Sequence, residues 1–145
     1  MAGEVVIQDG VSGWVSVATG VSLSAATFAQ VHATNTIAAL MAAGEEDYPE
    51  FDVLISVTTG TPAENEALQV HLRPKADGTN ENVAPSGSYQ PHFLGSVILD
   101  NTAPTTYCYA FGLSNIDKLG TFYLKTASVL TVNMSIRMRS VNAAA

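Results

Sequence analysis

The sequence predicts an all-β fold, an antiparallel sandwich of two sheets that is jelly-roll-like, with about eight strands and one short helix. Three observations support this prediction. Several segments alternate apolar and polar residues with a period of two, which is typical of half-buried strands. Turn signals rich in Gly, Pro, Asn and Asp separate those segments at short intervals. A helical period of apolar residues occurs in one segment alone.

The clearest strand covers residues 130–139, where every even position is apolar and every odd position is polar. Successive side chains of a strand lie on opposite faces of its sheet, so one face is dry and the other meets water or a partner. We expect the even-numbered set to line the core: Leu130, Val132, Met134, Ile136 and Met138.

The chain begins with a β-branched run, Val5-Val6-Ile7, that ends at the turn signal Asp9-Gly10. This run is either a terminal strand of the domain's own sheet or an N-terminal arm, residues 1–9, that pairs with a neighbour's sheet edge. Residues 13–18 and 28–33 predict two further short strands.

Asn35 can cap the one short helix, in which Ile37, Leu40 and Met41 share a face, and Gly44 ends it. An acidic run follows around Tyr48-Pro49. A calcium loop needs alternating oxygen ligands with a glycine at the turn, and this run has no such spacing, so we predict a solvated loop. The carboxylates of this run are Glu45, Glu46, Asp47, Glu50 and Asp52.

Two alternating segments in the middle of the chain, residues 51–58 and 67–73, predict antiparallel neighbours joined across a loop. His71 falls on the wet face of the second segment. A long irregular loop with three prolines or glycines follows at residues 81–91, and loops of that length in compact domains often serve contacts.

The second half of the chain predicts three more strands and a tail. Phe93–Leu99 is apolar at most positions, as expected of a strand covered on both faces. Residues 106–113 place aromatic residues on one face and small residues on the other, with Cys108 as a small buried core residue. Residues 121–126 form the next strand, and residues 142–145 a flexible tail.

Composition bounds the organisation and the partners. The chain has 145 residues, which fits a single domain over residues 1–145. Its residues are 47% hydrophobic and 13% charged, and this composition argues against disorder. Thirteen acidic against six basic residues give a net charge of −7, which repels phosphates and argues against nucleic acid. The start of the chain lacks the pattern of a cleaved leader, and no apolar run approaches the roughly 20 residues that cross a bilayer, so we expect no membrane partner.

The chain carries no recognisable catalytic motif. His32, His71 and His92 lie on separate segments without metal-ligand spacing, and Cys108 lacks the local signature of a nucleophile. We therefore predict no metal, no cofactor and no enzymatic activity. The lone cysteine fits synthesis in a reducing cytoplasm. A different function remains open, because aromatic side chains could form a platform on which sugars stack and make the domain a carbohydrate-binding module. The candidates for this platform are Trp14, Tyr48, Tyr89 and Tyr123.

The segment at residues 68–80 reads LQVHLRPKADGTN, an apolar strand that runs into Pro and then Asp-Gly-Thr-Asn. This pattern resembles small β-sandwich structural proteins of tailed bacteriophages. The resemblance continues through residues 93–100, an apolar strand after a Pro-rich loop, and through residues 122–139, which look like the family's final hairpin. It covers the second half of the chain, whereas residues 35–52 are particular to this sequence.

The resemblance implies a virion structural protein that is made in the host bacterial cytoplasm. Within that class we expect a capsid decoration (cement) protein that binds the outside of the head as a homotrimer, with the major capsid protein and copies of itself as partners. The alternatives are a tail or baseplate component and a carbohydrate-binding module of a host-recognition fibre. The expected interface residues are Glu4, Val5, Val6, Ile7, Pro85, Tyr89 and Pro91.

Overall fold

The computed structural model describes residues 5–9, 13–31, 50–74, 84–86, 93–101, 106–112 and 120–143. These residues form nine strands and parts of their connections, and none of them is helical. The predicted helix at residues 35–44 lies outside the described residues, as does most of the acidic loop. No helix in the described ranges has the length and apolar character needed to cross a membrane.

The first sheet is organised around β9 (Leu130–Ala143), which pairs antiparallel with three strands. β2 (Val15–Leu23) and β1 (Val5–Asp9) follow one another along one edge of β9, and β4 (Glu50–Thr59) occupies the other edge. β7 (Thr106–Gly112) pairs with β4.

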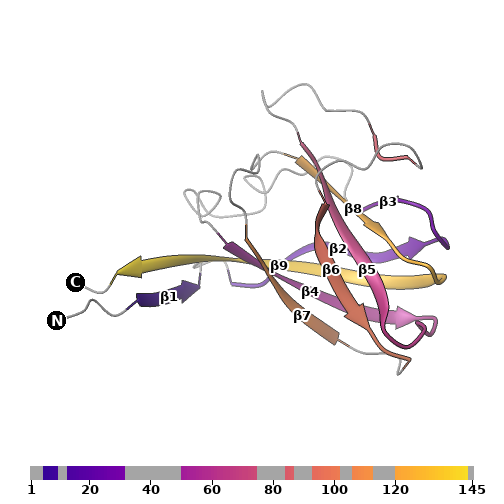
Figure 1. Cartoon of the computed structure of the whole chain (residues 1–145), viewed down its shortest axis with the longest axis horizontal. Helices are drawn as coiled ribbons and strands as arrows, with labels where there is room; N and C mark the ends of the chain where they lie inside the picture. Colours follow the sequence, from indigo (N-terminus) through magenta and orange to yellow (C-terminus); the bar gives the residue numbers. More distant parts are fainter. Residues whose placement is uncertain are drawn as a thin grey trace.

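The second sheet contains four antiparallel strands in the order β3-β8-β5-β6. The bounds of these strands are Ala29–Gln30 for β3, Gly120–Lys125 for β8, Glu66–Pro74 for β5 and Phe93–Leu99 for β6. The two sheets face each other and form a sandwich (Figure 1).

The strand order is that of a jelly roll. With β1 set aside, the sheets are β2-β9-β4-β7 and β3-β8-β5-β6, so the connections β2–β3, β4–β5, β6–β7 and β8–β9 all cross between sheets. Among the described strands from β2 onward, β5 and β6 are the only two that are consecutive in the sequence and also neighbours in one sheet. This arrangement confirms the predicted two-sheet antiparallel sandwich and its jelly-roll order.

Two predicted strand pairs are wrong. β4 and β5 were expected to be neighbours, and β8 and β9 to form a final hairpin, but the members of each pair lie in different sheets. Alternation of apolar residues reports which face of a strand is buried and carries no information about its partner. A short connection can join two strands of one sheet as a hairpin or carry the chain across to the other sheet. Its length therefore does not reveal which strand becomes the pairing partner, and contacts at the turn help to decide it.

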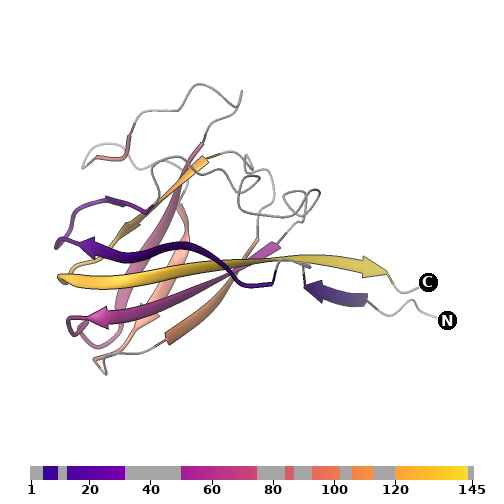
Figure 2. The ribbon, with the colours of Figure 1, turned by 180° about the vertical axis from the view of Figure 1, so that it is seen from behind.

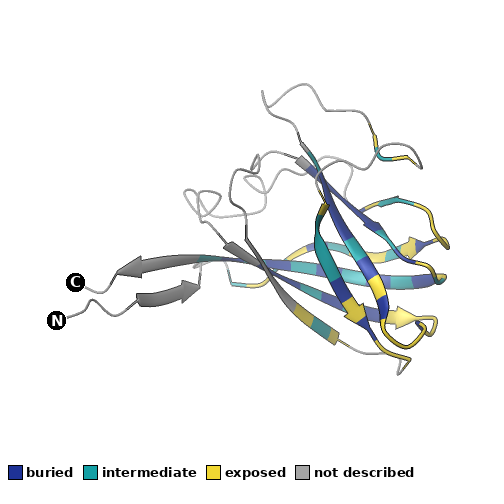
Figure 3. Cartoon of the chain, viewed as in Figure 1, coloured by how far each residue is buried: buried dark blue, intermediate teal, exposed yellow. Residues whose placement is uncertain are grey.

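The core is built from strands of both sheets, and Figure 3 shows the buried residues along these strands. Full burial of one aliphatic side chain contributes about 1.5–3 kcal/mol to folding. The even-numbered set of β9 is buried as predicted, with exposed fractions of 2% or less. The core residues are Val17, Leu23, Val31, Val53, Ile55, Val57, Leu68, Val70, Leu72, Val97, Leu99, Phe122, Leu124, Leu130, Val132, Met134, Ile136 and Met138.

Other predicted boundaries and environments need correction. The strand expected at residues 13–18 continues to Leu23, because register shifts in its pairing with β9 let it pass Gly20, where φ is +64°. β6 is covered on one face alone, since Phe93 is 57% exposed and Ile98 is 41% exposed on this edge strand. Residues 142 and 143, expected to begin a flexible tail, pair with β1 instead, and residues 144 and 145 lie outside the described residues.

A two-stranded ribbon leaves the body of the sandwich. β4 pairs with β9 as far as Arg139, whereas β1 pairs with β9 from Arg139 to Ala143. Beyond Arg139 the only described partner of β9 is therefore β1. Both views show β1 and the last residues of β9 extending away from the sandwich (Figures 1 and 2). We call this segment, Val5–Asp9 with residues 139–143, the ribbon.

Candidate functional site

Three of the connections that cross between sheets meet at one end of the sandwich. The backbone N–H of Ala26, between β2 and β3, donates to the carbonyl oxygen of Thr126, after β8, at 2.7 Å. Gly60, after β4, has φ +89°, and a Cβ built there would lie 2.5 Å from the carbonyl oxygen of Val129. Only glycine therefore fits between these turns.

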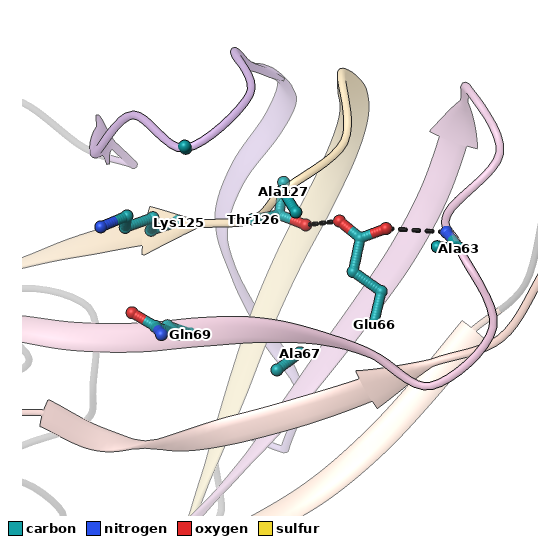
Figure 4. Close-up of a pocket in the computed structure, with 8 residues that line it drawn as sticks. Ala63, Glu66, Ala67, Gln69, Lys125, Thr126 and Ala127 are labelled. Atoms are coloured by element: carbon teal, nitrogen blue, oxygen red, sulfur yellow. Dashed lines mark hydrogen bonds between the residues drawn. The ribbon is translucent and has the colours of Figure 1, made fainter.

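Glu66 connects two of these turns through its carboxylate. Oε1 accepts the backbone N–H of Ser128 at 2.7 Å, and Oε2 accepts the Ser128 hydroxyl at 2.6 Å. Oε2 also accepts the N–H of Ala63 at 2.7 Å, and Oε1 accepts the hydroxyl of Thr126 (Figure 4). The side chain thus holds the β4–β5 turn against the β8–β9 turn.

The same contacts fix the charge of Glu66, which is 7% exposed. Burial alone would raise the pKa of its carboxyl. The hydrogen bonds from Ser128, Thr126 and Ala63 outweigh burial and lower the pKa from 4.5 to about 2. The carboxylate is therefore ionised at neutral pH, and both of its oxygens are occupied by donors within the protein.

A pocket of about 400 Å³ opens beside Glu66 (Figure 4). Its walls are small apolar side chains from the turns and polar side chains from β5 and β8. Gln69 and Lys125 lie directly opposite one another in the β5–β8 register and define its polar side. The lining residues are Ala26, Ala63, Glu66, Ala67, Gln69, Lys125, Thr126 and Ala127.

A second pocket of about 270 Å³ adjoins the first and shares Ala26 and Lys125 with it. Pro85, one of the predicted interface residues, lines this second pocket and is half-buried. The ammonium nitrogen of Lys125 lies 4.8 Å from the centroid of the Phe28 ring, within the range of a cation–π contact. We call the two pockets together the corner groove.

His71 lies beside the corner groove, and its predicted position on a wet face is wrong. The side chain is fully buried, because its ring packs between Phe28 at 4.9 Å and Phe93 at 5.2 Å between centroids. Nε2 of His71 lies 3.1 Å from Oε1 of Gln69. The outer face of β5 is thus covered at this point by aromatic rings from other segments. His32 and His92 lie outside the described residues.

The charged groups of the corner groove already have partners within the protein. Among the described lining residues, the Glu66 carboxylate accepts several hydrogen bonds, and the Lys125 ammonium group faces the Phe28 ring. Within the described ranges, no group of three or more His, Cys, Asp or Glu side chains could hold a metal ion.

A second polar cluster braces the root of the ribbon on the outer face of the first sheet. Asp52 of β4 lies opposite Arg137 of β9, and its Oδ2 accepts hydrogen bonds from Nη2 at 2.7 Å and Nε at 3.2 Å. Oδ1 of Asp52 lies 3.0 Å from Nη2 of Arg139. Asp52 itself is 3% exposed. The cluster fixes β9 to β4 at the residues where the ribbon begins.

Trp14 extends this second cluster. The guanidinium of Arg137 lies 4.7 Å from the centroid of the indole ring of Trp14. The Trp14 side chain is 38% exposed. Tyr123, the other described member of the predicted sugar platform, belongs to β8 in the opposite sheet and is 7% exposed. These two aromatic side chains do not share a surface. Tyr48 and Tyr89 lie outside the described residues.

The predicted interface residues fall in two separate places. Val5, Val6 and Ile7 belong to β1 in the ribbon, whereas Pro85 lines the corner groove. In both views β1 lies at the end opposite the β4–β5 and β8–β9 turns (Figures 1 and 2). β1 pairs with β9 of its own chain, as the first of the two interpretations expected. Glu4, Tyr89 and Pro91 lie outside the described residues.

Three features of these sites escaped the sequence-based predictions. Glu66 directly precedes the segment predicted as a strand, and nothing in its neighbours indicates the distant donors that it binds. Asp52 was assigned to a solvated run of carboxylates, although its alternation with Val53 already placed it on β4. Cys108, expected in the core, is exposed on edge strand β7.

Comparison with known proteins adds no assignment. No protein-family model matches the sequence, and no curated protein matches it.

Proposed function

We propose that this chain is a structural protein of a tailed-bacteriophage particle, a capsid decoration (cement) protein that binds the outside of the head. Its partners are the major capsid protein and other copies of itself, arranged as a homotrimer. It is made in the bacterial cytoplasm and acts on the virion, without a catalytic step.

The ribbon is the observation that carries this proposal. A two-stranded ribbon has too few contacts to be independently stable in water, so one that projects from a finished sandwich is suited to docking on another surface. β1 and residues 140–143 pair with each other, and neither has another described strand partner. The jelly roll behind the ribbon is an architecture of viral capsid domains and also of lectins.

The composition supports the same role. With 13% charged residues, much of the surface is left to small and polar side chains, which suit broad contacts without many buried charges. The corner groove adds a second surface at the other end of the sandwich, where Pro85 meets Lys125 and Phe28. Two separate contact surfaces allow one subunit to bridge two neighbours.

The test is to locate the chain on particles of a phage whose genome encodes it. Peptide mass spectrometry of purified particles should detect the chain in many copies, and particle imaging should place it on the outer surface of the head. Absence from purified particles would reject the proposal, and density confined to the tail or baseplate would replace it with the tail alternative. Binding of the isolated domain on a glycan array, without binding to heads, would instead favour the carbohydrate-binding alternative.

A further inference from the structure

The first pocket of the corner groove, about 400 Å³ in volume, has mostly apolar walls. Small-molecule sites span roughly 300–1,000 Å³ and are largely apolar, with a few polar groups that orient the ligand. Four exposed alanines, from the turns and from the start of β5, supply the apolar wall. They are Ala26, Ala63, Ala67 and Ala127. The pocket therefore has the size and the surface to hold a compact apolar group.

Lys125 lines both pockets of the corner groove and so lies where they meet. Its ammonium nitrogen faces the Phe28 ring at 4.8 Å, and an ammonium group carries three N–H donors. Among the described residues, no carboxylate forms an ion pair with the Lys125 side chain and no group accepts a hydrogen bond from it. This position therefore combines a positive charge with donors that a ligand can use.

Gln69 provides a second donor beside Lys125. The two residues are directly opposite each other in the β5–β8 register, and side chains in such a pair start roughly 5 Å apart on the same face of the sheet. Oε1 of Gln69 lies 3.1 Å from Nε2 of His71, so the amide nitrogen is the group left to donate. In the described part of the chain, nothing accepts a hydrogen bond from that nitrogen. An ammonium group and an amide group side by side match the two oxygens of a carboxylate.

Glu66, the carboxylate among the described lining residues, lies across the pocket from these donors. Figure 4 shows Lys125 and Gln69 on one side, with the ammonium group of Lys125 pointing away from Glu66. The two oxygens of Glu66 already accept four hydrogen bonds from the turns. Glu66 therefore has no need of a cationic ligand, and the donors that remain for a ligand are those of Lys125 and Gln69.

We propose that the corner groove binds a small amphiphilic carboxylate, a molecule with one carboxylate group on a compact apolar body. The apolar body packs against the alanines of the first pocket, and the carboxylate accepts hydrogen bonds from Lys125 and Gln69. Charge complementarity selects the carboxylate, because it pairs with the ammonium group and accepts N–H donors that the Phe28 ring leaves unused. This inference goes beyond the proposed function and rests on different residues from the ribbon that carries it.

The test titrates the full chain at neutral pH with phenylacetate and with phenylacetamide, its uncharged counterpart of nearly the same shape, and follows the backbone amides by NMR. We expect phenylacetate to cause saturable shifts at Ala67, Gln69 and Thr126, and phenylacetamide to bind at least about tenfold more weakly. K125M, which removes the charge and keeps a long side chain, should weaken phenylacetate by a similar factor and leave phenylacetamide unchanged. K125R keeps the charge and should keep most of the affinity.

A third variant, A67L, fills the apolar end of the pocket and should abolish binding of both probes. Phenylacetate that causes no saturable shift, equal affinity for the two probes, shifts confined to residues outside the groove, or unchanged binding in A67L would each overturn the inference. The comparison of the two probes uses the wild type alone, so it decides the question even if K125M fails to unfold cooperatively. Loss of attachment to phage particles would leave this inference standing, and failure of phenylacetate to bind would leave the proposed function standing.

Discussion

Glu66 and Ser128 are joined by two hydrogen bonds, one from the Ser128 backbone N–H to Oε1 and one from its hydroxyl to Oε2, at 2.7 and 2.6 Å. The two residues are 62 positions apart. Glu66 is the first residue of β5, directly after the β4–β5 connection, and Ser128 lies in the β8–β9 connection; both connections cross from one sheet to the other. Their contact holds β4–β5 and β8–β9 as crossings and thereby helps to set the jelly-roll order.

Replacing Glu66 by Gln should destabilise the fold by about 2–4 kcal/mol, because the amide nitrogen would face donors and leave buried groups unpaired. The measurement is urea unfolding at neutral pH. E64Q is the matched control, since Glu64 is exposed on the same turn, and it should change the free energy of unfolding by less than about 0.5 kcal/mol. Equal effects of the two substitutions would contradict the role of Glu66.

Acid should weaken the protein through the same carboxylate. The pKa of Glu66 in the folded state is about 2, below its ordinary value of 4.5, so its stabilisation is complete above pH 4.5 and is lost as the pH falls toward 2. The contribution lost is about 3 kcal/mol. The free energy of unfolding, measured at a series of pH values, should show this loss in the wild type. In E66Q the part of the pH dependence that comes from Glu66 should be absent. Parallel pH profiles would count against the assignment.

Gly60 should tolerate no side chain. In G60A the new Cβ would meet the Val129 carbonyl oxygen at 2.5 Å and the backbone would keep a φ of +89°, so we expect a loss of about 2–4 kcal/mol. Gly20 also has a positive φ, of +64°, but open space around it, so G20A should cost only about 1 kcal/mol. Thermal unfolding of the two variants separates the steric effect from the backbone effect.

Arg137 should report on the root of the ribbon through fluorescence. Trp14 is the single tryptophan of the chain, and the Arg137 guanidinium lies over its ring. R137A should shift the Trp14 emission to the red and lower stability by about 2–4 kcal/mol, because Asp52 would lose two hydrogen bonds on a nearly buried carboxylate. S56A, which removes an exposed hydroxyl contact on the same face of β4, serves as the control. An unchanged spectrum in R137A would show that the stacking does not persist in solution.

The sequence could predict the faces of the strands because burial imposes the period that the residues display. β9 is the plainest case, with five apolar residues that all enter the core. Strand partners could not be predicted in the same way, since β4 and β5 show the same alternation yet join different sheets. The Glu66 carboxylate binds the β8–β9 turn beside the crossing from β4 to β5, and its donors Thr126 and Ser128 are distant in the sequence.

The burial of individual polar residues could not be predicted from the sequence either. His71 was placed correctly on the outer face of β5, but Phe28 and Phe93 cover that face and bury it. Cover of this kind depends on which distant segments pack over a sheet, and alternation describes only the strand itself. Cys108 shows the opposite outcome, because it was expected in the core and is exposed on edge strand β7.

Attachment to phage heads tests the central claim most directly. Heads purified without this chain would be mixed with the full chain or with a chain that lacks residues 2–7, and the bound fraction would be measured by co-sedimentation. We expect the full chain to sediment with heads and the shortened chain to stay in the supernatant while still unfolding cooperatively. Equal sedimentation of the two would contradict the account, because the ribbon would then have no part in adhesion.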